Sequence, residues 1–212
     1  MRDWLAKLVQ FIEELGFDTE GLSREQLLYR RRRAYAHECG HAAVAWLSPA
    51  VVSIPGITFR RYGERAAQTA IQFLPGHPDY LIENALVTLG GLAGEVLVWK
   101  RVRSGGFADD LPMALEALTK FLERSTVGSI RRRWKDSLAD SGLDVAAMMS
   151  QRPPADLAEA LNLCFRRAKR LLQDNRAGFD RLVALAERKG DLTHDDIASQ
   201  FGPRPWAPTH PH

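Results

Sequence analysis

The sequence predicts a mainly α-helical protein of the α+β class, with one small β-sheet among its helices. Three observations support this fold class. A capping box formed by Ser23 and Gln26 begins a helical pattern that can continue to about Leu47. Two runs rich in β-branched and aromatic residues follow, at 51–59 and 69–74, as is typical of strands. Beyond them, apolar residues recur at helical spacing through most of the chain.

Composition is that of an ordinary globular protein. The 212 residues are enough for one substantial core or two small ones, and 45% are hydrophobic and 26% charged. A net charge of only +3 gives no long-range field that would gather nucleic acid. The two cysteines, Cys39 and Cys164, form no disulfide framework, so we expect a reducing, cytoplasmic setting.

Residues 1–22 predict an N-terminal amphipathic helix. Its acidic residues balance its basic ones, which favours packing on the domain or on a partner over binding to a membrane surface. The segment lacks the features of a signal peptide. The longest apolar stretches, 42–57 and 85–99, are too short or too interrupted to cross a bilayer, so we expect no membrane span.

The chemistry of the chain centres on the motif His-Glu-x-x-His at residues 37–41. On a helix, His37 and His41 stand four residues apart on one face, so both imidazoles can reach one metal ion. Glu38 lies beside them, close to a water that the metal would hold. Zn²⁺ suits this arrangement because it makes a bound water acidic and polarises a carbonyl, while the glutamate carries the proton.

A third protein ligand is needed to leave one open tetrahedral position. The sequence has no His or Glu at short spacing after His41, and Asp110, Asp109, Glu95 and Glu83 remain as candidates. Glu95 lies in a predicted helix over 78–101, where three glycines permit close contact, and we expect this helix to pack against the motif helix.

The strands indicate how a substrate would bind. Zinc peptidases commonly place a small sheet beside the motif helix, where an exposed edge pairs with an extended peptide. Pro55 argues that its own strand is not the central one, because proline cannot donate a ladder hydrogen bond.

Two basic clusters, 30–33 and 131–135, are interpreted as solvated surface. The alternative is contact with an acidic partner or nucleic acid, but the near-balanced overall charge makes nucleic acid an unfavoured partner. Further along, helices are predicted at 155–173 and 179–188, and Thr193 can cap a short one at 195–200. The Pro-rich tail from 202 to 212, including His210 and His212, is predicted to be disordered.

With these residues in view, the chain resembles the peptidase domain of the FtsH family of ATP-dependent zinc metalloproteases. Four segments carry the resemblance in the family's order, with similar spacing: Ala36-His37-Glu38-Cys39-Gly40-His41-Ala42, Gln72-Phe73-Leu74-Pro75, Leu89-Gly90-Gly91-Leu92-Ala93-Gly94-Glu95 and Gly106-Phe107-Ala108-Asp109-Asp110-Leu111. The resemblance implies that Asp110 is the third zinc ligand and that Asp109 is not a ligand. It also implies that Glu95 is a neighbour of the site that supports a ligand histidine.

The chain also departs from that family. It has no Gly-x-x-x-x-Gly-Lys-Ser/Thr phosphate loop, so we expect no ATPase of its own, and we expect no membrane anchor. Cys39 replaces an alanine and is expected to pack inertly, because its helical position points away from the face of the histidines. Leu92 replaces the family's arginine, which leaves an ion pair there in doubt.

The resemblance divides the chain into an N-terminal helix at 1–22, a metallopeptidase domain at 23–201 and a tail at 202–212. The domain has a zinc-site part at 23–125 and a helical part at 126–201. We expect a zinc-dependent metalloendopeptidase that acts on polypeptides, working with a separate ATPase or as a homo-oligomer. The alternative is an inactive binding or regulatory protein of the same fold.

Overall fold

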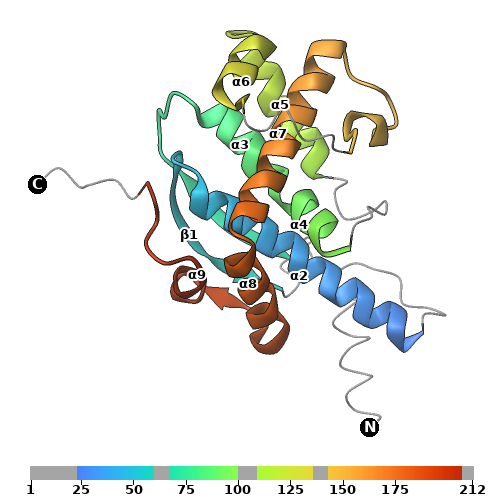
Figure 1. The fold of residues 1–212 in the computed structure, drawn as a ribbon, viewed down its shortest axis with the longest axis vertical. Coiled ribbons are helices and arrows are strands. Elements are labelled where there is room, and N and C mark those ends of the chain that lie inside the picture. The colour runs from blue at the N-terminus through green and yellow to red at the C-terminus, as the bar shows by residue number, and fades with distance from the viewer. Residues whose placement is uncertain (1–22, 60–66, 100–108, 136–142, 207–212) are drawn as a thin grey trace, which may run out of the picture.

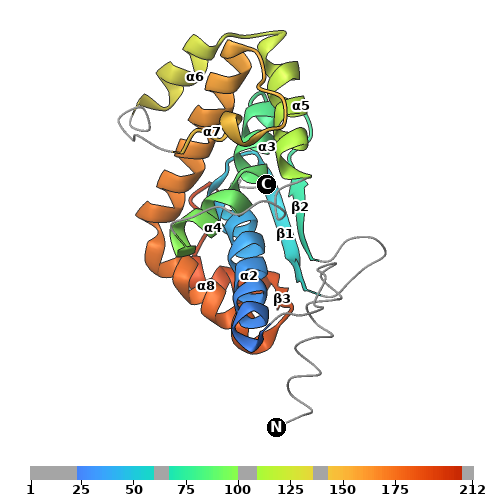
Figure 2. The same ribbon diagram turned by 90° about the vertical axis from the view of Figure 1, so that its right-hand side faces the viewer.

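The computed structural model describes residues 23–59, 67–99, 109–135 and 143–206. The predicted N-terminal helix within 1–22 and the end of the chain at 207–212, with His210 and His212, lie outside the described residues. In the described part, helix α2 (Arg24–Leu47) lies between a small sheet and the helices α4 (Gly90–Trp99) and α7 (Ala155–Asp174) (Figures 1 and 2). The prediction of a mainly helical fold with a small sheet is confirmed.

Helix α2 begins and ends as predicted. The Ser23 hydroxyl accepts a hydrogen bond from the backbone N–H of Gln26, and the Gln26 side chain accepts one from the N–H of Ser23, at 3.3 and 2.7 Å. Ser48 is the C-cap. Every residue from Tyr35 to Trp46 is buried, because neighbouring elements cover α2 on all sides of this segment.

The sheet contains β1 (Val51–Thr58), β2 (Gln68–Phe73) and the two-residue β3 (Leu192–Thr193) in the antiparallel order β2-β1-β3. The two predicted strands are confirmed, but the prediction that the Pro55 strand is not central is wrong. Proline is tolerated because β3 pairs only with Gly56 and Ile57, and the register with β2 shifts between Ser53 and Gly56. Pro55 lies in that irregularity, where no ladder N–H is required.

The helix predicted over 78–101 is divided in two, α3 (Tyr80–Thr88) and α4 (Gly90–Trp99). Helix α4 packs directly against α2, as expected. A Cβ atom at Gly40 would lie 2.2 Å from the carbonyl oxygen of Gly90, and one at Gly94 would lie 2.4 Å from that of Ala36. Backbone therefore meets backbone at this contact, which only glycine permits.

Residues 80–99 are long and apolar enough, by length and composition alone, to cross a membrane. This differs from the expectation that the apolar stretches are too short. In the structure, 72% of the most apolar part of this stretch is buried inside the protein, so it forms part of the core.

In Figure 1 the remaining helices lie above and below α2, and the long helix α7 runs between the two groups. They match the predicted segments at 155–173, 179–188 and 195–200, the last with a capping box between Thr193 and Asp196. One hydrophobic core includes residues on both sides of the predicted boundary at 125/126, and that division stays a prediction. The bounds are α5 (Asp110–Leu122), α6 (Val127–Arg133), a 3₁₀ turn η2 (Ala146–Met148), α7 (Ala155–Asp174), α8 (Arg176–Lys189) and α9 (His194–Phe201).

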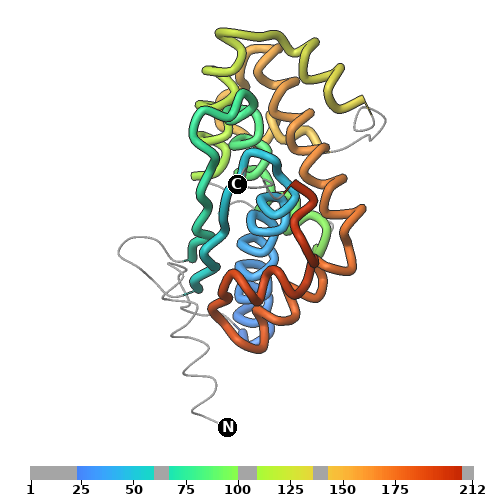
Figure 3. The backbone as a smooth tube through the Cα atoms, turned by 90° about the vertical axis from the view of Figure 1, so that its left-hand side faces the viewer, coloured from blue at the N-terminus to red at the C-terminus, as the bar shows by residue number. Residues whose placement is uncertain are grey.

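The chain after α9 turns back to the C-terminal end of α2, which Figure 3 shows in red and blue. The Arg204 guanidinium donates to the carbonyl oxygens of Ala45, Ser48 and Val52, at 3.2, 3.2 and 2.7 Å. The prediction of a disordered tail from 202 is therefore wrong for 202–206. The carbonyls at the end of a helix lack intrahelical partners, and Arg204 supplies donors to them.

The glycine contact between α2 and α4 makes a stability prediction. Gly40→Ala should lower the free energy of unfolding by about 3 kcal/mol, because the added methyl overlaps the Gly90 carbonyl and the two helices must separate. Chemical denaturation measures the change. Gly128→Ala is the control, since its Cβ would meet nothing closer than 3.5 Å. An unchanged stability of Gly40→Ala would contradict the contact.

Candidate metal centre

Three side chains that can bind a metal converge between α2 and the first turn of α5. The Nε2 atoms of His37 and His41 lie 3.0 Å apart, and Oδ2 of Asp110 lies 3.0 Å from the first and 3.3 Å from the second. Within the described residues, these are the three His, Cys, Asp or Glu side chains whose donor atoms all lie within 4.8 Å of one another.

The outer nitrogens of both histidines are held by acceptors. Nδ1 of His37 lies 2.8 Å from Oε1 of Glu95, and Nδ1 of His41 lies 2.9 Å from the carbonyl oxygen of Val87. A carboxylate and a carbonyl can only accept, so each Nδ1 carries the hydrogen and each Nε2 presents its lone pair to the centre. The arrangement sets both imidazoles in the state that a metal ligand requires.

The donor set fits a cation. Two nitrogen lone pairs and a carboxylate oxygen face one another at 3.0 to 3.3 Å, and as long as the Nε2 atoms carry no proton, the buried Oδ2 of Asp110 has no hydrogen-bond partner. Such a group is unfavourable unless a positive charge lies among the donors. Gly91 keeps the space open, because a Cβ atom there would lie 2.5 and 2.6 Å from the Nε2 atoms of His41 and His37.

Without a metal, the centre binds protons instead. Burial lowers the pKa of His37, but hydrogen bonds to Asp110 and Glu95 outweigh it and raise the pKa to about 10. For His41, burial likewise lowers the pKa, and the charge of Asp110 outweighs it and raises the pKa. Burial raises the pKa of Asp110, but the charges and hydrogen bonds of the two histidines outweigh it and hold the pKa below its usual range. A metal ion therefore has to displace a proton.

Glu38 follows His37 on α2 and lies close enough to the histidines for its charge to raise the pKa of both. Its Oε2 accepts a hydrogen bond from the hydroxyl of Thr69 at 2.8 Å. Thr69 belongs to β2, so the sheet orients the glutamate of the motif. Sequence reasoning missed Thr69 and the Val87 carbonyl, because no local pattern marks a contact between distant elements.

The other candidates for the third position lie elsewhere or have other partners. Glu83 is buried and accepts a hydrogen bond from the Ser48 hydroxyl at 2.9 Å. Asp109 occupies the N-cap position of α5 and is exposed. Glu95 contacts His37 from the far side, at Nδ1. Asp110 is the one of the four candidates that meets both Nε2 atoms.

Glu95 has a second partner that sequence reasoning placed on the surface. The Arg33 guanidinium lies 2.5 Å from Oε2 of Glu95, and Arg33 is only 9% exposed. The interpretation of 30–33 as a solvated cluster is therefore wrong for this residue. The neighbouring Arg32 fits it better, since it is an exposed residue that pairs with Glu187.

The second basic cluster also binds carboxylates of the same chain. Arg131 pairs with Glu159, and Arg133 pairs with Asp79. Trp134 is 6% exposed, so its ring belongs to the core and is not available for stacking on a base.

Cys39 lies between the two histidines in sequence but is fully buried, and burial raises the pKa of its thiol well above the usual value. Burial also raises the pKa of Cys164. Both thiols are therefore kept protonated and inert.

The fold and the centre define a class of protein: a mainly helical His-Glu-x-x-His protein with a buried His/His/Asp group that could hold a metal ion. Comparison with curated proteins makes the assignment more particular. No family model matches the sequence. Relatives are the ATP-dependent zinc metalloprotease FtsH of Karelsulcia muelleri, 24% identical over 89% of this chain and 32% of that protein, and FtsH 2 of Symbiobacterium thermophilum, 28% identical over 79% and 29%.

A further relative is the mitochondrial inner membrane m-AAA protease component yta12 of Schizosaccharomyces pombe, 20% identical over 96% of this chain and 28% of that protein. The chain is a distant homologue of the FtsH and m-AAA proteases, as its motifs predicted. It spans about a third or less of the length of these relatives.

The centre makes a prediction about the metal-free protein. The pKa of His37 rises from 6.5 in the unfolded chain to about 10 in the fold, so its contribution to stability is complete below pH 6.5 and lost as pH rises toward 10. In EDTA, thermal unfolding should therefore show a melting temperature that falls between pH 6.5 and 10. His37→Gln should lack this part of the fall, and an identical pH profile for both proteins would contradict the prediction.

Proposed function

We propose that the protein is a zinc-dependent metalloendopeptidase. The observation that carries this proposal is the convergence of Asp110 with His37 and His41 beside Glu38. These three residues would hold Zn²⁺, the metal in the names of the FtsH relatives. When bound, zinc supplies a Lewis acid for the peptide carbonyl and makes a water molecule acidic.

The protein's own residues would perform the proton transfers. Glu38 takes a proton from the attacking water and returns it to the leaving nitrogen, as a general base and then a general acid. The hydroxyl of Thr69 holds one oxygen of Glu38 and leaves the other for this transfer. Glu95 and the Val87 carbonyl hold the two imidazoles in the tautomer that presents Nε2 to the metal.

A polypeptide is the proposed substrate, bound along β2. In the described part of the chain, β2 pairs only with β1, so its other edge offers backbone groups to an extended peptide. Since Thr69 of β2 contacts Glu38, a peptide paired with this edge would pass the glutamate.

We further propose that peptide cleavage by this chain needs no ATP, because its sequence contains no phosphate-loop motif. We also propose that the protein is located in the cytoplasm. There it would work with a separate ATPase or as a homo-oligomer. Adding ATP to the pure protein should leave its rate on a disordered substrate unchanged. A clear stimulation by ATP would refute this part.

The alternative is a binding or regulatory protein of the same fold, without turnover. Two substitutions separate the functions. Glu38→Gln should reduce cleavage of a disordered protein by 10²-fold or more while zinc content stays the same, because it removes the proton acceptor and no ligand. Asp110→Asn should reduce both cleavage and zinc content, measured by elemental analysis.

Asp109→Asn is the matched control, since its side chain lies one residue from Asp110 and outside the donor group. It should behave as wild type in both measurements. Full cleavage by Glu38→Gln would reject the peptidase mechanism, and full zinc content in Asp110→Asn would reject the ligand set.

A further inference from the structure

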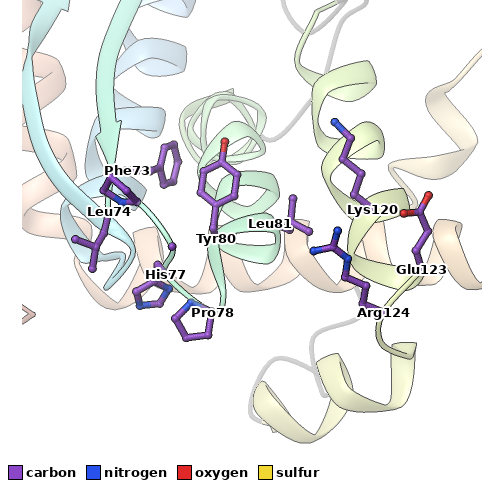
Figure 4. A pocket seen from close by; sticks show the side chains of 11 residues that line it. Phe73, Leu74, His77, Pro78, Tyr80, Leu81, Lys120, Glu123 and Arg124 are labelled. Carbon is purple, nitrogen blue, oxygen red and sulfur yellow. The ribbon is translucent and has the colours of Figure 1, made fainter.

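A cavity of about 880 Å³ opens at the far end of β2, away from the metal centre. Its walls come from the end of β2 and the loop into α3 on one side, and from the C-terminal end of α5 on the other (Figure 4). None of the metal-centre residues lines it. The cavity and the centre therefore lie at two separate positions along the same strand.

Strand β2 connects the two positions. Thr69 contacts Glu38, and Phe73 lines the cavity. Thr69 and Phe73 are four positions apart, which corresponds to about 13 Å of extended chain. A peptide paired with β2 and cleaved at the centre would thus reach the cavity about four residues from the cleaved bond.

One wall of the cavity is apolar. Phe73 and Tyr80 pack edge to face at 5.3 Å, and Leu74 and Leu81 lie beside them. Leu74 and Tyr80 are each 40% exposed, which is unusual for large apolar side chains that gather at one place. This wall suits an apolar side chain.

The opposite wall is cationic. Lys120 is already paired with Glu116 one turn earlier in α5, at 2.5 Å. Arg124 also lines the cavity, and within the described parts of the chain no ion pair engages its guanidinium. Glu123 next to it supplies the one carboxylate of the lining. Arg124 is therefore available to bind a carboxylate.

We propose that this cavity is a substrate subsite of the metallopeptidase. It takes an apolar side chain of the extended polypeptide and, next to it, an acidic residue that pairs with Arg124. This inference rests on the proposed function, because the molecule in the cavity is taken to be the polypeptide substrate. If the peptide runs antiparallel to β2, the more common pairing, the subsite lies on the N-terminal side of the cleaved bond.

Binding tests the subsite without turnover. Zinc-loaded Glu38→Gln protein is titrated with unstructured fluorescent peptides that contain Leu-Glu, Leu-Lys or Asn-Glu in a constant background, and anisotropy is measured. Leu-Glu should bind about three- to five-fold more tightly than Leu-Lys, as for one exposed ion pair. It should bind about ten-fold more tightly than Asn-Glu.

Adding Arg124→Glu should reverse the order of affinity for Leu-Glu and Leu-Lys, whereas the control Arg188→Glu, at an exposed position of α8, should not. Equal affinities in the parent protein, or an order that ignores Arg124, would overturn the subsite. This result is independent of whether the wild type cleaves. The distance between the subsite and the cleaved bond is measured by sequencing the products that wild type and Arg124→Glu release from a denatured protein mixture. The preference for an apolar residue next to an acidic one is expected three to six residues from the cleaved bond.

A second inference comes from the far side of the metal centre. Glu95 is 1% exposed and accepts from both Nδ1 of His37 and Nε of Arg33. A buried carboxylate needs a cation, and this chain has Leu92 at the position where the FtsH family has an arginine. Arg33 stands one helical turn before His37 on α2 and supplies that charge from another helix.

We infer that Arg33 is a positioning residue for the metal centre. Its Nε donates to one oxygen of Glu95 and holds the carboxylate where the other oxygen fixes the His37 ring through Nδ1. Arg33→Met should weaken Co²⁺ binding about ten-fold or more and alter the visible absorption bands of the bound Co²⁺, while Arg33→Lys should keep most of the affinity.

The neighbouring Arg32→Met is the control, because Arg32 pairs with Glu187 at the surface. If Arg33→Met alone does not fold, the comparison is made in Glu95→Gln, where a neutral acceptor replaces the carboxylate. There the further loss of Co²⁺ affinity caused by Arg33→Met should fall to less than about two-fold. Wild-type Co²⁺ affinity and absorption in Arg33→Met, or an equal loss in both backgrounds, would overturn the inference.

Discussion

The contact between α2 and α4 is the constraint on which the rest of the site depends. Gly40 faces Gly90 and Gly94 so closely that no side chain separates the two backbones. Because the helices approach this far, Gly91 comes beside the imidazoles of α2, and Glu95 reaches Nδ1 of His37. The glycines weaken α4 as an isolated helix, but the close packing that they permit brings Glu95 to His37.

With both Nε2 atoms unprotonated, the centre consists of three electron-pair donors that repel one another. A metal ion or a proton among them attracts all three. Two imidazole nitrogens and one carboxylate oxygen lie within 4.8 Å of one another in a mostly buried position. Farther out the charges are balanced in pairs, with Glu95 between His37 and Arg33. The three donor atoms at the centre therefore lack a cationic partner, whereas Glu95 next to them has one in Arg33.

The sheet links the centre to the surface. Strand β2 orients Glu38 through Thr69 at one end and forms part of a cavity at the other. Its partner β1 holds it against α2 and accommodates Pro55 where the ladder shifts register. A peptidase that binds extended chain gains from this arrangement, because the same strand would set the position of the peptide and of the catalytic glutamate.

The sequence alone determined the local features. The capping box at Ser23, the spacing of His37 and His41, the strands and the C-terminal helices follow from patterns within a few residues. It could not choose Asp110 among four acids without the family resemblance, and it misplaced Arg33, Pro55 and Arg204. Tertiary structure decided those points, because burial, the length of β3 and the partners of a guanidinium depend on which distant segments the fold brings within hydrogen-bond distance.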